Sequence, residues 1–185
     1  MIVFDTETTG LPLADSAPLS SQPKIIEIAL MKLDEDMNVL ESYERLVNPE
    51  IPIPKDATAV NGILDSDVEN MPPFVGILNE LSDFFIGQDK IFAHNVVFDM
   101  RMLVFELRRI GYEYKFPYPK NQICTVEMSK PLLSTDDAPR SLRLVDLYHH
   151  AFDKKHDKAH RAMDDVKALV EYMKWMKEKE LIWLI

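Results

Sequence analysis

The spacing of hydrophobic positions predicts strands at the start of the chain. The apolar segments 1–4, 24–33 and 39–47 have the length and residue types of strands. The acidic turn 34–36 joins the last two of these, so we expect them to pair antiparallel. A loop rich in Ser, Pro and Ala is expected to follow the first strand, over residues 8–23. The first part of the chain is therefore expected to build a sheet.

Later in the chain the hydrophobic positions recur every three or four residues, which is typical of helices. Residues 48–62 precede this change, and their prolines predict an extended segment. Short strands are expected at 90–93 and 122–125. Helices are expected at 74–86, 96–110 (ending at Gly111), 142–152 and 161–179. Strands followed by strand–helix alternation predict an α/β domain with a mixed sheet covered by helices.

The last predicted helix carries an acid on its apolar face. At about 100° per residue, Asp165 lies within the apolar stripe of this helix, about 40° from Leu169, whereas Asp164 points away. The stripe consists of Ala162, Val166, Leu169, Tyr172, Met173 and Met176. A carboxylate that faces a core is unfavourable unless it is paired or binds a metal. Asp165 is therefore a candidate metal ligand.

Two other segments show the same anomaly. Asp5 and Glu7 alternate along the end of the first strand, so their carboxylates project from one face. Asp99 shares its helix face with Leu103 and Leu107 and should also point inward. Four acids from three segments form an oxygen-rich site that suits Mg²⁺ or Mn²⁺, and such acids can hold two ions about 4 Å apart.

A histidine stands five residues before the last of these acids. If the helix began at His160, this side chain would lie opposite the Leu169 stripe, so we place it in the loop entering the helix. A mobile imidazole beside Asp165 suits a general base. The other histidines of this region, at 149, 150 and 156, are interpreted as surface residues.

Composition and charge set broad limits. The 185 residues fit one domain, and 46% hydrophobic with 28% charged residues is typical of a globular protein. Cys124 is the only cysteine and no apolar run is long enough to span a bilayer, so we expect a cytoplasmic protein without membrane partners. The net charge is −10, but the basic residues gather after residue 100. This asymmetry fits either uneven solvated faces or a phosphate-binding second half.

Three motifs resemble one known family. FDTETTGL, HNVVFD and AHRAMDD match, in order and spacing, the exonuclease motifs of the DnaQ-like 3′→5′ exonucleases. The histidine five residues before the last aspartate is typical of the DEDDh branch, which includes the proofreading epsilon subunit of DNA polymerase III. The segment 48–67 is similar to the family's linker between the first two motifs. The resemblance implies an RNase H-like fold with a five-stranded mixed sheet, forming a single exonuclease domain over residues 1–185.

The resemblance also implies roles for individual residues. Asp5 would bridge two divalent cations, Mg²⁺ or Mn²⁺, and Glu7, Asp99 and Asp165 would complete the ligand set. His160 would deprotonate the attacking water. The residues implied to bind the terminal nucleotide are Thr8, Thr9, Leu11, Val60, Asn61, His94, Asn95 and Phe98. Many relatives carry His at the position of Asn61.

The expected activity is release of nucleoside 5′-monophosphates from the 3′ end of single-stranded DNA. An exoribonuclease is the alternative within this class, and a non-catalytic nucleic-acid-binding or replisome module is the alternative outside it. The chain ends soon after the last helix and lacks the long polymerase-binding tail of the epsilon subunit, so a free-standing nuclease or a polymerase partner bound through another surface is expected. The apolar end, 181–185, is expected to pack on the core.

Overall fold

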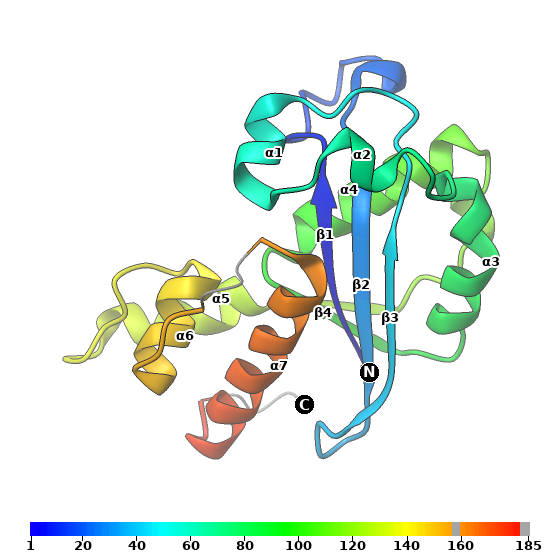
Figure 1. The fold of residues 1–185 in the computed structure, drawn as a ribbon. Coiled ribbons are helices and arrows are strands. Elements are labelled where there is room, and N and C mark those ends of the chain that lie inside the picture. Colours follow the sequence, from blue (N-terminus) through cyan, green and yellow to red (C-terminus); the bar gives the residue numbers. More distant parts are fainter. Residues whose placement is uncertain (157–159, 182–185) are drawn as a thin grey trace.

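A five-stranded mixed sheet forms the centre of the protein (Figure 1). The computed structural model describes residues 1–156 and 160–181. The strand order is β3-β2-β1-β4-β5, in which β1, β2 and β3 pair antiparallel and β4 runs parallel to both β1 and β5. The strands are β1 (Ile2–Thr8), β2 (Ile25–Leu33), β3 (Val39–Leu46), β4 (Lys90–Ala93) and β5 (Asn121–Cys124). The predicted mixed α/β sheet is confirmed.

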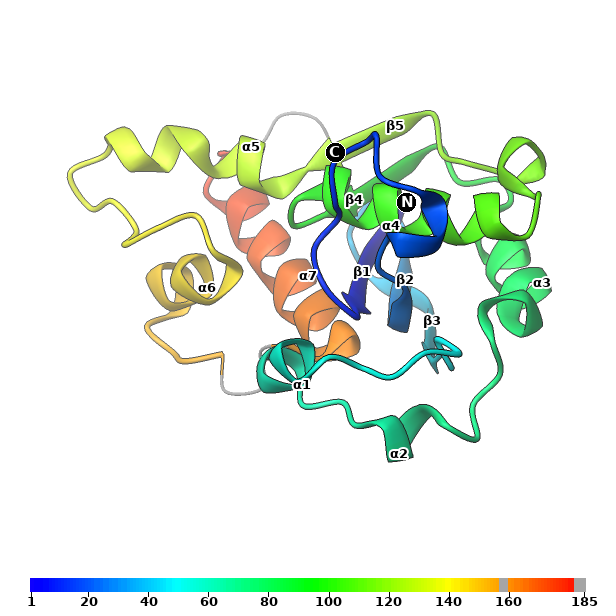
Figure 2. The same ribbon diagram turned by 90° about the horizontal axis from the view of Figure 1, so that it is seen from above.

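Helices cover both faces of this sheet. The helices are α1 (Lys55–Asn61), α2 (Asp65–Val68), α3 (Phe74–Phe85), α4 (Val96–Arg109), α5 (Thr125–Ser129), α6 (Leu144–Phe152) and α7 (Ala162–Glu178). Short 3-10 turns occur at Leu19–Ser21, Glu113–Lys115 and Lys130–Ser134. Seen from above, α4 and α7 lie on opposite sides of β1 (Figure 2). Strand β1 therefore has a helix on each side, and its two predicted acids, Asp5 and Glu7, are half-buried.

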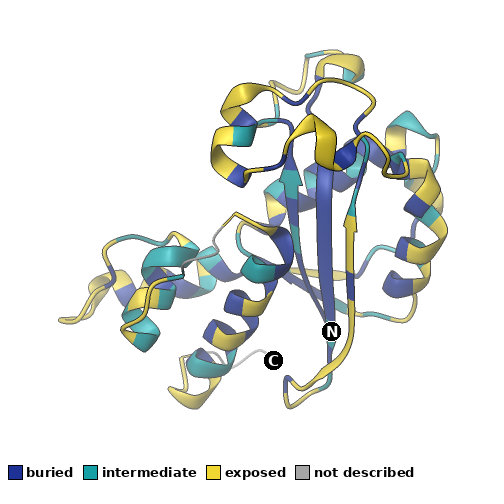
Figure 3. Ribbon diagram, in the orientation of Figure 1, coloured by how far each residue is buried: buried dark blue, intermediate teal, exposed yellow. Residues whose placement is uncertain are grey.

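The alternation of side chains along β1 explains this arrangement. Ile2 and Phe4 belong to the core that packs under α3 and α4, whereas Val3 belongs to the core that packs under α7. Because alternate residues share a face, Asp5 and Glu7 continue the Val3 side toward α7. The strands β1 and β2 are the most deeply buried part of the sheet (Figure 3). The polar end of β1 thus meets the beginning of α7.

The extended segment predicted for 48–62 is wrong in its second half. Helix α1 begins directly after Pro54 and ends at Gly62, which adopts the left-handed conformation (φ 71°). Proline has a fixed φ that suits a helix start, and glycine tolerates a left-handed helix end. Residues 54–62 carry both signals, a proline before the helix and a glycine after it. The extended backbone is confined to the residues that precede the helix.

Three other differences are smaller. The short helices α2 and α5 were not predicted, and β1 continues to Thr8 rather than ending near Phe4. Antiparallel pairing with β2 accounts for the longer strand, because this pairing extends along β1 to Thr8.

Among the described residues, no helix is both long and apolar enough to cross a membrane. The expected packing of the apolar end falls mainly on residues 182–185, which lie outside the described residues.

Candidate metal-dependent active site

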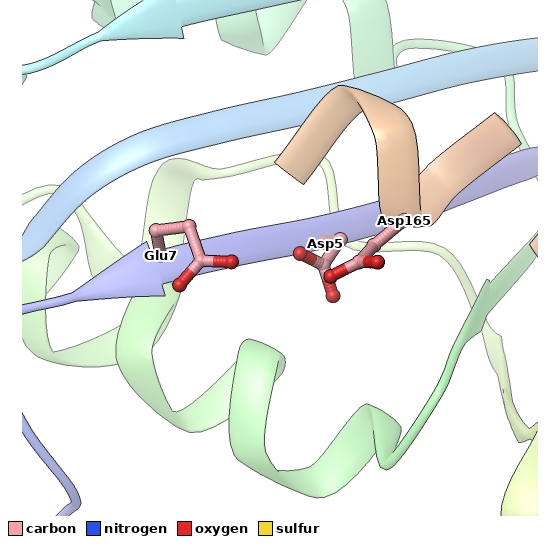
Figure 4. A group of neighbouring side chains, drawn as sticks. All are labelled: Asp5, Glu7 and Asp165. Carbon is pink, nitrogen blue, oxygen red and sulfur yellow. The ribbon is translucent and has the colours of Figure 1, made fainter. Parts of the chain in front are cut away.

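Three of the predicted carboxylates converge at the end of β1. Asp5, Glu7 and Asp165 each offer one carboxylate oxygen, and these three oxygens lie within 4.8 Å of one another. Two of these side chains project from β1 and the third projects from the first turn of α7 (Figure 4). The predicted stripe of α7 is buried, and this packing directs Asp165 toward the strand. The structure therefore brings together acids that lie 160 residues apart in the sequence.

The electrostatics of this cluster favour a bound cation. Burial, together with the negative charges of Asp99 and Asp165, raises the pKa of Asp5 well above its usual range. Burial and the charge of Asp165 raise the pKa of Glu7 to about 8. A divalent cation between the carboxylates would remove this repulsion and restore their ionised forms. The cluster offers only oxygen ligands, which suit Mg²⁺ or Mn²⁺.

Asp99 lies beside this cluster and binds to β1. Strand β4 pairs with β1 only at Ile2 and Val3, so β1 extends beyond β4 toward its carboxyl end. There Asp99 Oδ1 accepts hydrogen bonds from the backbone N–H of Thr6 (3.0 Å) and from its hydroxyl (2.8 Å). The residue is buried, and burial raises the pKa of Asp99 to about 7 despite these two bonds. The inward orientation predicted for Asp99 is confirmed.

His160 lies just before α7, as predicted, and its side chain is exposed. Its backbone has a positive φ of 72°, which is uncommon for a residue other than glycine. The backbone N–H of His160 donates to Asp165 Oδ2 at 3.0 Å. This bond joins the histidine-bearing turn to the predicted metal ligand through the backbone rather than through the imidazole.

The interpretation of His156 as a surface residue is wrong. Its side chain is only 9% exposed, and its Nε2 lies 2.5 Å from Asp165 Oδ1. The ring also packs against Tyr148. Of His156 and His160, it is thus His156 whose imidazole contacts Asp165. Nothing in the local sequence pattern indicated this contact, because it depends on the tertiary packing that brings the His156 ring beside Asp165 and Tyr148.

Glu27 is a buried acid of this region that the sequence reasoning missed. It lies in β2 directly opposite Glu7 and is 0% exposed. Arg161 forms an ion pair with it, and the backbone N–H of Ala162 donates to it at 2.9 Å. The signal that could have revealed Glu27 is a single carboxylate in the apolar segment IIEIAL, the same anomaly that singled out Asp165.

A cavity of about 500 Å³ opens next to the carboxylates. Its walls come from the end of β1, the loop after it, helix α1 and the start of α4. Six of the predicted nucleotide-binding residues line it, namely Thr8, Thr9, Leu11, Val60, Asn61 and Phe98. Glu7 also lines the cavity and so joins it to the carboxylate cluster. The linker between the first two motifs thus provides one wall of the cavity.

The remaining two predicted nucleotide-binding residues lie apart from this cavity's lining. His94 is held by Thr125 Oγ1 (3.0 Å from Nδ1) and by the backbone oxygen of Leu142 (2.8 Å from Nε2). Burial lowers the pKa of His94, so the neutral imidazole is favoured. Asn95 is exposed and begins α4 with a positive φ of 81°. Both residues lie in the turn that leads from β4 to Asp99.

Comparison with known proteins shows relatives that are longer than this chain. The DNA polymerase III PolC-type protein of Clostridium perfringens is 31% identical over 178 residues, which is 96% of this chain and 11% of that protein. A putative bifunctional exonuclease/endonuclease protein of Mycobacterium tuberculosis is 32% identical over 180 residues, covering 96% of this chain and 26% of that protein. The chain therefore spans about a tenth to a quarter of the length of these relatives.

Solved structures confirm the predicted RNase H-like fold. Escherichia coli exonuclease I in complex with a dT13 oligonucleotide has a TM-score of 0.75 at 20% identity, over 97% of this chain and 41% of that one. The nuclease domain of 3'hExo, a DEDDh family member bound to rAMP, has a TM-score of 0.76 at 16% identity, over 96% of this chain and 91% of that one. At these identities the likeness concerns the fold.

The family assignment depends on the sequence as a whole. The family model RNase_T, described as exonuclease, matches residues 2–173. This range includes the three motifs and every residue of the carboxylate cluster. The chain therefore belongs to the RNase_T exonuclease family, which confirms the DnaQ-like resemblance of its motifs.

Proposed function

We propose that this protein is a metal-dependent 3′→5′ exonuclease that releases nucleoside 5′-monophosphates from the 3′ end of single-stranded DNA. One observation supports this above all others. The carboxylates of Asp5, Glu7 and Asp165 converge, and one of them, Glu7, also lines a cavity of about 500 Å³. A site of this size suits a small-molecule group such as one nucleotide, since ligand cavities range from roughly 300 to 1,000 Å³.

The carboxylates would hold two divalent cations, Mg²⁺ or Mn²⁺. The residues that would hold them are Asp5, Glu7, Asp99 and Asp165. Bound in this way, the cations supply a nucleophilic water at neutral pH and stabilise charge on the phosphate. The donor set fits this role because its ligands are all carboxylates, and the pKa values of Asp5, Glu7 and Asp99 are raised when no cation neutralises them. The role of the protein is to hold the carboxylates ready on β1, α4 and α7.

His160 would act as the general base that takes a proton from the attacking water. Its place in the turn before α7 leaves the imidazole exposed while its backbone is bonded to Asp165. His156 is the rival, because its imidazole contacts the same aspartate. We favour His160 because the Nε2 of His156 is directed at a carboxylate that we assign to the metal, whereas His160 remains free to reach a water.

The terminal nucleotide would occupy the cavity. Leu11 is 78% exposed and lies with Phe98 on the cavity wall, so both can make apolar contact with the base. Thr8, Thr9, Val60 and Asn61 line the same cavity, and Glu7 would lie near the 3′-hydroxyl. His94 and Asn95 would act from the neighbouring turn. Asn61 is buried and its amide faces the backbone oxygen of Thr8 (3.4 Å), so its contribution would be to shape the wall.

RNA is the alternative substrate, because one protein of similar fold is described as bound to rAMP. Single-stranded DNA is favoured by the PolC-type relatives and by the exonuclease I complex with dT13. The same relatives support a polymerase or replisome partner. A non-catalytic binding module is disfavoured because all four acids and His160 are present. We place the protein in the cytoplasm.

The function is tested with 5′-labelled DNA and RNA of equal sequence, in Mg²⁺ or in EDTA. We expect a ladder that shortens from the 3′ end only with Mg²⁺, and the relative rates identify the preferred sugar. Asp165→Ala should abolish the ladder. Asp164→Ala is the matched control, because this neighbouring acid is oriented toward Lys167 (3.9 Å) instead. Intact substrate after incubation of the wild type with Mg²⁺ would refute the proposal.

A further inference from the structure

The first turn of α7 obtains its cap from a distant strand. Arg161 occupies the N-cap position, but its side chain makes no capping bond within the helix. The backbone N–H of Ala162 instead donates at 2.9 Å to Oε2 of Glu27, which lies near the start of β2. A helix start without a partner of its own leaves N–H groups unsatisfied. Glu27 therefore satisfies the first of these groups and determines where α7 begins.

The same carboxylate binds the side chain of the N-cap residue. The Nε of Arg161 lies 3.1 Å from Glu27 Oε2 and 3.2 Å from Oε1, and its Nη2 lies 2.5 Å from Oε1. This is a two-pronged, charge-assisted contact of the strong kind. Glu27 is fully buried, whereas the Arg161 side chain is 47% exposed. The sheet therefore provides the buried carboxylate of this ion pair, and the turn before α7 provides the partly exposed guanidinium.

This contact lies immediately next to the proposed general base. His160 precedes Arg161, and its backbone has the uncommon φ of 72°. On one side its N–H is bonded to Asp165, and on the other side Arg161 is bonded to Glu27. A strained backbone of this kind persists only where the surroundings hold it. The two bonds therefore hold the backbone of His160 in place and fix the direction in which its side chain points away from the backbone.

We propose that Glu27 is a positioning residue that acts through Arg161 on His160. Its carboxylate holds the turn before α7 so that the imidazole of His160 is presented to the carboxylate cluster. This inference rests on the proposed function, in which His160 is the base. Glu27 itself is not a ligand in this scheme, because it lies outside the group of ligand oxygens formed by Asp5, Glu7 and Asp165 and pairs with the charge of Arg161 instead.

The test is Glu27→Gln, which keeps the shape of the side chain and an acceptor for Ala162 but removes the charge that binds Arg161. We expect kcat to fall by about 10- to 100-fold, the loss typical of residues that orient an active-site group. The KM for the oligonucleotide should not change, and the fall in kcat should persist at saturating Mg²⁺, although losing the charge of Glu27 near Asp5 and Glu7 should weaken Mg²⁺ binding. Arg161→Lys, which keeps the charge but not the planar fork, should retain more activity than Arg161→Met.

A double-mutant cycle separates positioning from a merely structural role. In a His160→Ala background, Glu27→Gln should lower single-turnover cleavage no further, because the group on which it acts is gone. An additive loss in that background would overturn the inference, as would recovery of the wild-type kcat by Glu27→Gln when Mg²⁺ is raised to saturation. Full activity of Glu27→Gln, in an enzyme that His160→Ala inactivates, would overturn it and leave the proposed function intact. Wild-type protein that degrades no strand would refute the function itself.

Two variants control for folding. Glu27→Met combined with Arg161→Met replaces the ion pair by apolar side chains, which proteins often tolerate without loss of stability. We expect this variant to unfold at a somewhat lower temperature, because the backbone N–H of Ala162 loses its acceptor, and to show the reduced kcat of Glu27→Gln under conditions in which it is fully folded. Glu80→Gln removes an ion pair with Arg45 (3.1 Å) on the outer surface and should leave kcat unchanged. Wild-type kcat in the Met/Met variant would overturn the inference.

Discussion

Glu7 should destabilise the folded protein when no metal is bound. It shares a cluster with Asp5 and Asp165, whose ligand oxygens all lie within 4.8 Å of one another. Burial and the charge of Asp165 raise the pKa of Glu7 from 4.5 to about 8. The substitution Glu7→Gln removes this ionisable group while keeping the size of the side chain. We therefore expect the variant to be more stable than the wild type in EDTA at high pH.

The sign and size of the effect follow from proton linkage. Between pH 4.5 and 8 the unfolded chain loses the Glu7 proton while the folded protein keeps it, so stability falls as the pH rises. Below pH 4.5 both states are protonated and Glu7 has no effect. The pKa difference is 8 minus 4.5, or about 3.5 pH units, at about 1.36 kcal/mol per unit. The ionised carboxylate should thus lower the free energy of unfolding by at most about 5 kcal/mol above pH 8.

Urea denaturation in EDTA at pH 4.5 and pH 8.5 measures this difference. The unfolding midpoint of Glu7→Gln should exceed that of the wild type by up to about 2 M urea at pH 8.5, and by nothing at pH 4.5. Saturating Mg²⁺ should stabilise the wild type, by about 2.7 kcal/mol at 100 times its Kd, and should stabilise the variant less. Glu35→Gln, at an exposed turn, is the control and should follow the wild type. Equal midpoints for wild type and Glu7→Gln at pH 8.5 would refute the reasoning.

Three further outcomes are expected. His160→Ala should reduce kcat by about 10²- to 10⁴-fold in a cleavage assay, whereas His156→Ala should retain turnover. If His156→Ala is instead the more damaging change, His156 is the general base. Leu11→Ala should raise the KM for single-stranded DNA without changing the thermal midpoint, because Leu11 is 78% exposed on the cavity wall; an unchanged KM would remove it from the substrate site. Tyr172→Phe loses a buried hydrogen bond to Ser129 (2.8 Å), so calorimetry should show a midpoint about 2–4 °C lower, and an unchanged midpoint would count against this bond.

Several features of the fold could be predicted from the sequence because they depend on local periodicity. The spacing of apolar residues predicted α3, α4, α6 and α7, and the apolar segments predicted all five strands. The inward orientation of Asp99 and Asp165 followed from the same spacing, because a helix places every third or fourth residue on one face. The linker helix α1 was missed, since its prolines indicated an extended chain more strongly than Gly62 indicated a helix end.

The contacts of the site could not be predicted because they join distant segments. The sequence by itself determined which acids are anomalous, namely Asp5, Glu7, Asp99 and Asp165, since a charge on an apolar face must be compensated. Only the tertiary structure decided that β4 stops before the end of β1, which leaves Thr6 to bind Asp99. It also placed His156 against Asp165 and Glu27 under the start of α7, because such contacts depend on the packing of α7 across β1 and β2 and not on spacing along the chain.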